Sequence, residues 1–369
     1  GSLRHATLDN LNRKIERHLA FWEKQQVDRP LIGFQVGSYQ AVSDFETSKK
    51  LADQNQPITP DQINIEDYAS DYDKVYRRHQ QVNHDMIWTA TPIPSFPWME
   101  AFLGCEIKGT GSSFWAASPI DTLDELSEVT FARNGEWFQA FKEFLDELIS
   151  LSEGKYPVGQ PILRGPTDLL GALLGESEFV VQLAKDPDKL KKTIRFLGES
   201  FSEVVQFIQD RVPDFHGGRS IGSVYSLWAP GKCLYLQEDL SALLSPDLYR
   251  RHFLEVDTEI AKTYEYSLFH LHPSSSFIFE DILGIEPLQV VEVNRDLGES
   301  GDLDSVIPFF RKVLEKKRLQ IRGRLTQEEI DLLLDSLPYS GLYIQIVIDS
   351  IEEANELFEY MKKKCSKQR

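Results

Sequence analysis

The chain has 369 residues, of which 41% are hydrophobic and 27% charged, as is typical of a globular protein. Its 58 acidic and 40 basic residues give a formal net charge of −18 at pH 7. This charge argues against nucleic acid and anionic membrane surfaces as partners, because phosphate binding requires clustered Lys and Arg. The three cysteines are too few for a disulfide framework, and no apolar stretch is long enough to cross a membrane. We therefore expect a cytoplasmic protein.

The first part of the sequence predicts a less regular order of helices and strands than the rest. Apolar spacing predicts an amphipathic helix over residues 10–26, and an apolar run predicts a strand over residues 31–36. Three prolines within residues 91–98 exclude a helix interior or a central strand, so we predict a shaped loop at a pocket rim or an interface. We expect one domain over residues 1–369, with residues 1–28 as its N-terminal helical extension.

From residue 157 onward, predicted strands alternate with amphipathic helices. We expect strands at residues 161–163, 267–271, 288–293, 319–321 and 342–348. Helix starts are indicated by Asp186-Pro187, by Ser245-Pro246, and by the capping boxes Thr326-x-x-Glu329 and Ser350-x-x-Glu353.

This alternation indicates an α/β fold with a parallel sheet covered on both faces. A doubly wound sheet would also satisfy it, but the chain has no early GxGxxG and no Walker A motif. We therefore predict a (β/α)8 TIM barrel with an irregular N-terminal extension.

Two histidines, His270 and His272, lie at the carboxyl end of a predicted strand, where barrel enzymes carry their reactive residues. Side chains at i and i+2 of a strand point to the same side. Together they could bind one Zn²⁺, or one of them could act as a general acid or base. The alternative is a pair of hydrogen-bonded core histidines.

A zinc site would need at least one more protein ligand. Asp239, Glu292 and Cys233 are the candidates, and none has diagnostic spacing. Glu292 is the best of them because it also lies at a strand end, so the predicted metal set is His270, His272 and Glu292. Each of the three candidates could instead be a hydrogen-bonding or solvated side chain.

Other residues near strand ends are candidate substrate contacts. Arg164 and Arg322 follow predicted strands and could hold a carboxylate or phosphate through paired hydrogen bonds, although ion pairs with neighbouring acids are the equal alternative. Tyr225 and Trp228 could shape the pocket, although large rings more often pack in a core. Asp168 and Asp239 would orient or polarise the ligand, with Asp239 among the catalytic candidates.

Several segments, in order, resemble the uroporphyrinogen decarboxylase-like superfamily over about residues 29–361. They are LRGPTDLLGALLGE at residues 163–176, KDPD at 185–188, LQEDLSALLSP at 236–246 leading into Tyr249 and Phe253, and residues 85–104 ending in EAFLG. The resemblance implies a (β/α)8 barrel whose cleft lies at the carboxyl ends of the strands.

The chain departs from true uroporphyrinogen decarboxylases at three places. Their two substrate-binding arginines would fall within residues 30–39, which contain none, and their catalytic aspartate would fall within residues 88–91. Their serine before the Ser-Pro pair matches Asp239. The resemblance therefore does not imply decarboxylation of a porphyrinogen, whose eight carboxylates would need those cations.

The closer resemblance is to the cobalamin-dependent methyltransferases of the same superfamily. They carry a zinc-binding His-x-Cys-Gly where this chain has His270-Leu-His272-Pro273, and their later cysteine would fall near residues 343–345, where none stands. The resemblance implies zinc, which lowers the pKa of an acceptor thiol, and a corrinoid carried by a partner protein.

Three hypotheses follow. The first is a methyltransferase-like enzyme that uses His270 and His272, with zinc and a corrinoid as expected cofactors. The second is a decarboxylase or lyase on a small carboxylate, in which Arg164 or Arg322 holds the acid and His272 delivers a proton. The third is a barrel that binds a ligand or corrinoid protein without catalysis. A small-molecule substrate is expected in the first two, and a homodimer is a further expectation.

Overall fold

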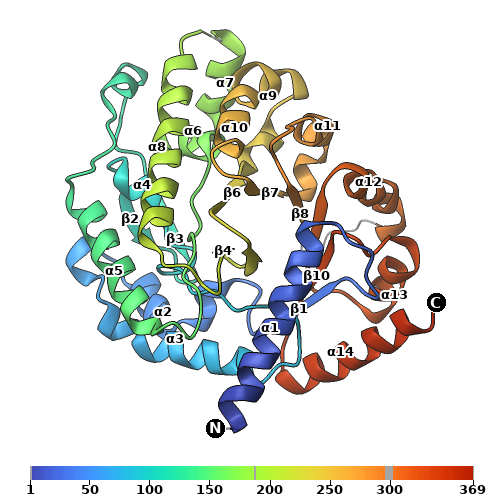
Figure 1. Ribbon diagram of the computed structural model, residues 1–369. Helices are drawn as coiled ribbons and strands as arrows, with labels where there is room; N and C mark the ends of the chain where they lie inside the picture. Colours follow the sequence, from blue (N-terminus) through green and yellow to red (C-terminus); the bar gives the residue numbers. More distant parts are fainter. Residues whose placement is uncertain (1, 187, 296–301, 369) are drawn as a thin grey trace.

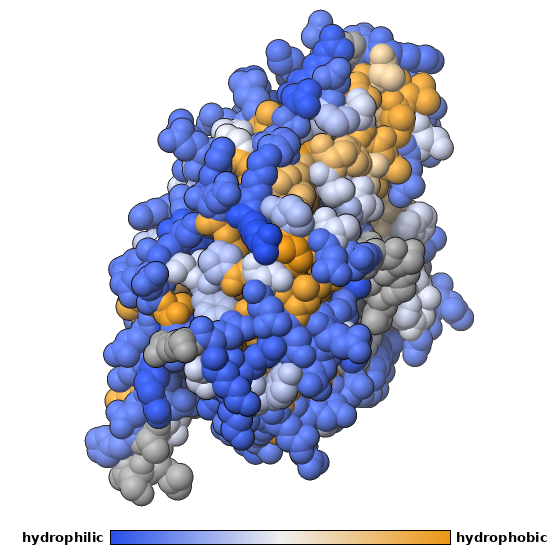
Figure 2. All heavy atoms as spheres, turned by 90° about the vertical axis from the view of Figure 1, so that its right-hand side faces the viewer, coloured by the Kyte–Doolittle hydropathy of each residue, from blue (hydrophilic) through white to orange (hydrophobic). Residues whose placement is uncertain are grey.

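The computed structural model describes residues 2–186, 188–295 and 302–368. Its central feature is a six-stranded parallel sheet with the order β1-β10-β9-β8-β7-β6, and helices lie around it (Figure 1). Hydrophilic residues cover most of the face formed by α12, α13 and α14, and apolar residues gather in its upper part (Figure 2). Within the described ranges, no helix is long and apolar enough to cross a membrane. The parallel sheet and the helices around it make the fold α/β, as predicted.

The strands of the parallel sheet are β1 (Leu31–Val36), β6 (Cys233–Gln237), β7 (Tyr266–Leu271), β8 (Val290–Arg295), β9 (Arg318–Gly323) and β10 (Leu342–Ile348). Two antiparallel pairs are β2 (Glu106–Gly109) with β3 (Phe114–Ala117), and β4 (Arg219–Ile221) with β5 (Leu227–Ala229). The short 3-10 helices are η1 (Ala41–Asp44), η2 (Pro60–Gln62), η3 (Leu123–Glu128), η4 (Asp239–Leu243) and η5 (Pro273–Ile278).

The helices of the first half are α1 (Ser2–Trp22), α2 (Glu46–Asp53), α3 (Ile65–Gln80), α4 (Trp98–Phe102), α5 (Glu136–Ser152), α6 (Pro166–Leu174) and α7 (Glu176–Lys185). Those of the second half are α8 (Lys191–Arg211), α9 (Pro246–His252), α10 (Leu254–Ala261), α11 (Phe279–Leu283), α12 (Leu303–Lys316), α13 (Gln327–Ser336) and α14 (Ile351–Ser366).

The hydrogen-bonded sheet is open, because its strand order ends at β1 and β6. Residues 85–91 and 157–163 run between these two ends, joined to each other by a parallel bridge between Ala90 and Val158. Pro157 and Pro161 lack the N–H groups that a regular ladder needs. The side-chain amide of Gln160 instead bonds both the N–H and the carbonyl of Tyr235 in β6, at 3.1 and 3.0 Å. The strand predicted at residues 161–163 is therefore not formed, and closure of an eight-stranded barrel is not observed.

Most predicted helix starts are found, with instructive exceptions. Thr326 forms the reciprocal capping box of α13, and Ser350 accepts a hydrogen bond from the Glu353 N–H at α14. The helix after Ser245 breaks at Phe253, where the backbone leaves helical geometry. The Asp186 carboxylate accepts from two N–H groups of the turn before α8 rather than capping that helix. Pro187 lies outside the described residues.

The described residues form three clusters of apolar core, of which two pack against the parallel sheet and a small third one lies around Trp228. The larger lies between the sheet and the surrounding helices. The smaller lies inside the curve of the sheet, where Phe21 and Trp22 of α1 pack with Leu31, Leu268 and Val290 near the amino ends of the strands. The predicted helix at residues 10–26 thus begins earlier and ends at Trp22, because its last turn packs beneath the sheet. This packing fills the amino ends and leaves the carboxyl ends of the strands for polar groups.

Candidate active site

Three titratable side chains meet where neighbouring strands end. His270 of β7 lies opposite Glu292 of β8 in the sheet register, and its Nδ1 shares a short hydrogen bond with Glu292 Oε2. Its Nε2 lies 3.6 Å from Oδ1 of Asp239, the first residue of η4 after β6. The imidazole therefore lies between two carboxylates, with Glu292 fixing its orientation.

The electrostatics of this group favour a charged imidazole. Burial works against the imidazolium, but the Glu292 carboxylate, supported by Asp239, outweighs it and raises the pKa of His270 to about 9. The side chains of Glu292, His270 and Asp239 are 0%, 6% and 38% exposed. A ligand would consequently reach His270 from the Asp239 side, with Glu292 behind it.

Asp239 is held in place by its neighbours. Asp168 of α6 accepts hydrogen bonds from the N–H groups of Leu240 at 2.8 Å and Asp239 at 3.3 Å. Burial, and then the charge of Asp239, raise the pKa of Asp168 to about 8. Gln237 Nε2 donates to Asp239 Oδ2 at 2.6 Å, whereas Asp239 Oδ1 has no hydrogen-bond partner in the described structure. Asp168 thus acts as a positioning residue for Asp239, and Oδ1 remains available.

Gly165 allows α6 to approach the end of β6. Its N–H donates to the Gln237 carbonyl at 2.9 Å, and a Cβ at this position would lie 2.5 Å from that oxygen and nearer still to the Glu238 carboxylate. Gly165→Ala is therefore expected to destabilise the fold by about 1–3 kcal/mol and to displace Asp239. Urea unfolding measures the loss.

Gly284→Ala is the matched control for this prediction. Gly284 has a φ of −75°, and a Cβ there would meet only ordinary contacts at 3.4 Å or more. Equal stability of the two variants would contradict the close packing of α6 against β6.

His272 lies close to His270, but its Nδ1 contacts a hydroxyl where that of His270 contacts a carboxylate. The two ring centroids are 6.2 Å apart with their planes at 83°. His272 Nδ1 lies 2.7 Å from the Ser274 hydroxyl in the turn that follows β7. The two imidazoles therefore share one end of the sheet, and His270 is the one that lies between Glu292 and Asp239.

The predicted zinc ligands do not form a complete zinc site. Two ligands on one tetrahedral Zn²⁺ lie roughly 3.3 Å apart, and the 3.6 Å between His270 Nε2 and Asp239 Oδ1 is near this value. Glu292 instead bonds the far nitrogen of the ring, as a carboxylate behind a ligand would. No group of three His, Cys, Asp or Glu side chains in the described ranges is arranged to hold a metal. Zinc therefore stays a prediction, and no chemical step below depends on it.

Arg322 of β9 places a buried positive charge beside this group. Its guanidinium donates to Gln35 Oε1 at 2.7 and 3.1 Å, to the Tyr39 carbonyl at 2.9 Å and to Asn294 Oδ1 at 3.3 Å. All of these acceptors are neutral. The guanidinium of Arg322 thus reaches the end of β1 from β9.

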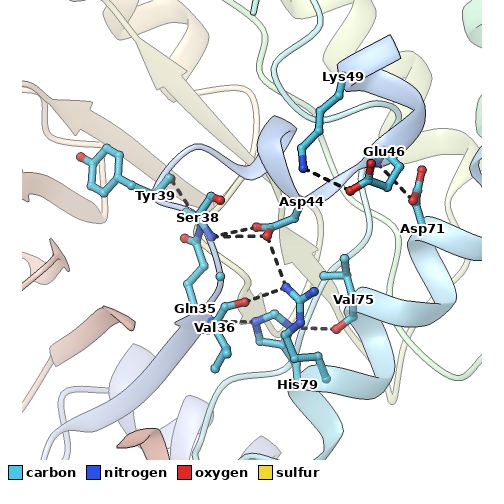
Figure 3. A network of polar contacts seen from close by, with 12 residues as sticks. Gln35, Val36, Ser38, Tyr39, Asp44, Glu46, Lys49, Asp71, Val75 and His79 are labelled. Atoms are coloured by element: carbon cyan, nitrogen blue, oxygen red, sulfur yellow. Dashed lines mark hydrogen bonds and ion pairs between the residues drawn. The ribbon is translucent and has the colours of Figure 1, made fainter. Parts of the chain in front are cut away.

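A polar network holds the turn after β1 in place (Figure 3). Gln35 Nε2 donates to the Ser38 carbonyl at 2.9 Å, and the Ser38 N–H donates to the Asp44 carboxylate. Arg78 ties the Asp44 carboxylate to the Val36 carbonyl. These contacts fix the Gln35 oxygen that receives Arg322.

Two of the remaining predicted site residues lie near His270 or Asp168, and two lie away from them. Tyr225 is buried with its ring centroid 6.0 Å from that of His270, and Arg164 forms a 3.1 Å ion pair with the buried Glu100 near Asp168. Trp228 instead packs under α1 and donates to the Phe215 carbonyl, and Cys233 begins β6 at the opposite end from Asp239. The structure therefore does not bring Trp228 and Cys233 to His270.

Sequence analysis missed the amide groups inside the curve of the sheet. Gln320 lies opposite Glu292 in the register and donates to Gln345 Oε1 at 2.7 Å, and both are fully buried. The signal was present: polar residues recur at every second position of apolar strands, as Gln320 and Arg322 do in β9. Such alternation in a buried strand indicates a polar interior.

Comparisons with known proteins were informative at the level of the fold. No family model and no curated protein matches the chain. Among solved structures, a methyltransferase from Methanosarcina mazei superposes with a TM-score of 0.63 at 13% identity, over 94% of this chain and 97% of that one. The likeness shows a shared fold across nearly the whole of both chains.

Proposed function

We propose that the chain is a methyltransferase-like enzyme that binds a small acceptor at the carboxyl ends of its strands. The observation that carries the proposal is His270, buried and held charged between Glu292 and Asp239 in a fold shared with a methyltransferase. We further propose that the complete fold is a (β/α)8 barrel of the uroporphyrinogen decarboxylase-like type, with its mouth at these residues.

The geometry suggests how the acceptor would be activated. A methyl group is transferred to an anionic nucleophile more readily than to its protonated form, as with a thiolate. The Nε2–H of the His270 imidazolium would donate to that anion and lower the pKa of the acceptor. Asp239, whose buried Oδ1 lies 3.6 Å from His270 Nε2 and has no hydrogen-bond partner in the described structure, would take the acceptor's proton and hold it until the product leaves. Glu292 would keep His270 protonated throughout.

Two cofactors belong to this proposal. A corrinoid on a partner protein would supply the methyl group as an electrophile, and the lone pair of the acceptor anion would form the new bond to it. Zinc, when bound, would act as a Lewis acid on the acceptor. His270 Nε2, after losing its proton, and Asp239 Oδ1 would hold it with one further ligand, so zinc would replace the imidazolium as the activating group and would not act beside it.

Methyl transfer from free methylcobalamin to a panel of small thiols tests the proposal. We expect transfer by the purified protein, followed by the loss of methylcobalamin absorbance and by the mass of the product, and analysis of the same sample for bound zinc. His270→Ala should lower the rate by about 100-fold or more. His5→Ala is the control, because His5 is exposed on α1. Thiol binding that survives His270→Ala, without transfer by any variant, would instead support a non-catalytic barrel.

Arg322 favours a second candidate, a decarboxylase or lyase that acts on a small carboxylate. A buried guanidinium whose acceptors in the described part of the chain are all neutral can exchange one of them for a carboxylate, to which it would bind in a paired, charge-assisted manner. The sequence assigned proton delivery to His272, but we propose His270 for this role because it is the imidazole held protonated by Glu292, and its proton would go to the carbon that loses CO2. Release of CO2 from a carboxylate panel, without methyl transfer, would favour this candidate over the first.

A further inference from the structure

A polar cavity lies at the other end of the molecule from His270. It measures about 500 Å³ and lies between one face of α1 and one face of α14, beside the segment that leads into β1 at Leu31. Because β1 and β7 are parallel, its place at the amino end of β1 is opposite to the carboxyl end of β7, where His270 lies. The proposed reaction uses none of its residues.

One face of α1 forms one wall of this cavity, which we call the groove. Asn10, Arg13, Lys14 and Arg17 recur on α1 at intervals of three and four residues, so they share one face of the helix. The apolar residues of the opposite face pack against Trp228 and its neighbours. The basic face is therefore held in position by the packing of the apolar one.

The other wall comes from α14 and the segment before β1. The ring of Phe358 in α14 is contacted by two cations, with Arg29 Cζ 5.1 Å and Lys362 Nζ 4.7 Å from its centroid. Arg29 also forms a buried ion pair with Asp85. Fixed cations on both walls thus face the same space.

The groove carries more positive than negative charge, against the trend of the whole chain. Among the described residues, five cations line it (Arg13, Lys14, Arg17, Arg29 and Lys362), and three carboxylates do so (Asp28, Asp85 and Glu359). Arg17, Arg29 and Lys362 have carboxylate partners. In the described ranges, no ion pair joins Arg13 or Lys14 to a carboxylate. A surplus of two positive charges in a chain of net charge −18 is a local arrangement that favours an anion.

Lys14 adds a second, independent indication. It is 8% exposed, and its ammonium donates to the Met86 carbonyl at 3.2 Å, which uses one of its three donors. Burial lowers the pKa of Lys14 to about 8, with Asp85 opposing the shift. A bound anion would offset this burial by pairing with the ammonium.

We propose that this groove binds a small organic phosphate, independently of the reaction proposed for the His270 site. A phosphate monoester carries about two negative charges at neutral pH, which equals the surplus in the groove. Arginine forks and a lysine ammonium are the usual phosphate donors in proteins. The volume of about 500 Å³ lies in the range of small-molecule sites, which leaves room for an organic group beyond the phosphate itself.

Calorimetric titration at constant ionic strength tests the proposal, with ribose 5-phosphate, inorganic phosphate and citrate as ligands. We expect ribose 5-phosphate to bind, and Arg13→Gln/Lys362→Gln to weaken it by about tenfold or more. Lys191→Gln/Lys192→Gln is the matched control, because it removes the same charge from exposed residues of α8 outside the groove. The control should keep the affinity of the unmodified protein.

Other results would overturn the proposal. Equal weakening in both double variants would show a response to net charge alone, and absence of ribose 5-phosphate binding to the unmodified protein would remove the site. Tighter binding of citrate than of either phosphate would assign the groove to carboxylates instead. His270→Ala should leave the affinity unchanged, so a failure of the proposed enzymatic function would not alter this result.

Discussion

Replacing Glu292 with glutamine is expected to lower the pKa of His270 from about 9 to near or below its ordinary value of about 6.5. Burial of the imidazole would persist, while the carboxylate that opposes it would be gone. Methyl transfer near neutral pH should fall by about 100-fold, because His270 would no longer be charged. Histidine resonances in an NMR titration measure the pKa directly, and the pH dependence of the rate should shift to lower pH with it.

The same change has a defined effect on stability. A histidine whose pKa is higher in the folded than in the unfolded chain stabilises the fold fully below about pH 6.5, and this contribution is lost as the pH rises through about 9. The shift corresponds to about 3 kcal/mol. Glu292→Gln should remove this pH dependence from urea unfolding. Glu259→Gln, at an exposed position of α10, is the control, and an unchanged His270 titration in Glu292→Gln would contradict the arrangement.

Arg322→Met is expected to move the pKa of His270 in the opposite direction. Arg322 lowers this pKa by its charge, so its removal should raise the pKa further. The substitution also leaves the buried acceptor on Gln35 and the half-buried acceptor on Asn294 without their donor, which should cost about 2–3 kcal/mol of unfolding free energy. NMR titration and urea unfolding together measure both effects.

Arg251→Met controls for the loss of a positive charge, because Arg251 is exposed at the end of α9. If Arg322→Met and Arg251→Met shift the pKa of His270 equally, the effect comes from net charge and not from the buried position of Arg322. If Arg322 also holds a substrate carboxylate, its variant should raise KM for carboxylates.

Most of the parallel sheet could be predicted from the sequence, because its strands are short, apolar and separated by amphipathic helices. The strands over residues 267–271, 288–293, 319–321 and 342–348 are all found, within a few residues at their ends. The region between β1 and β6 could not be predicted. There a glutamine side chain replaces backbone bonds to Tyr235, and this substitution leaves no periodic pattern in the sequence.

The candidate site could be predicted in part, because strand patterns in the sequence also indicate which residues lie at strand ends. Strand ends and spacing at i and i+2 indicated His270, and the structure places Glu292 and Asp239 against it. The sequence could not show which ring nitrogen each carboxylate meets, because that depends on sheet register and on the turn into η4. Nor could it show that Trp228 packs beneath α1, since an aromatic residue near a loop fits a pocket and a core equally well.

Gln160 has a consequence for how such a protein can vary. A backbone ladder fixes the spacing of two strands at about 4.8 Å, whereas a side chain that spans the gap can be exchanged for a shorter or longer one. The spacing between residues 157–163 and β6 therefore depends on the length of one side chain at this point. A chain with the same strands and a shorter or longer residue in place of Gln160 would have a narrower or wider interior. Such a chain would accommodate ligands of a different width.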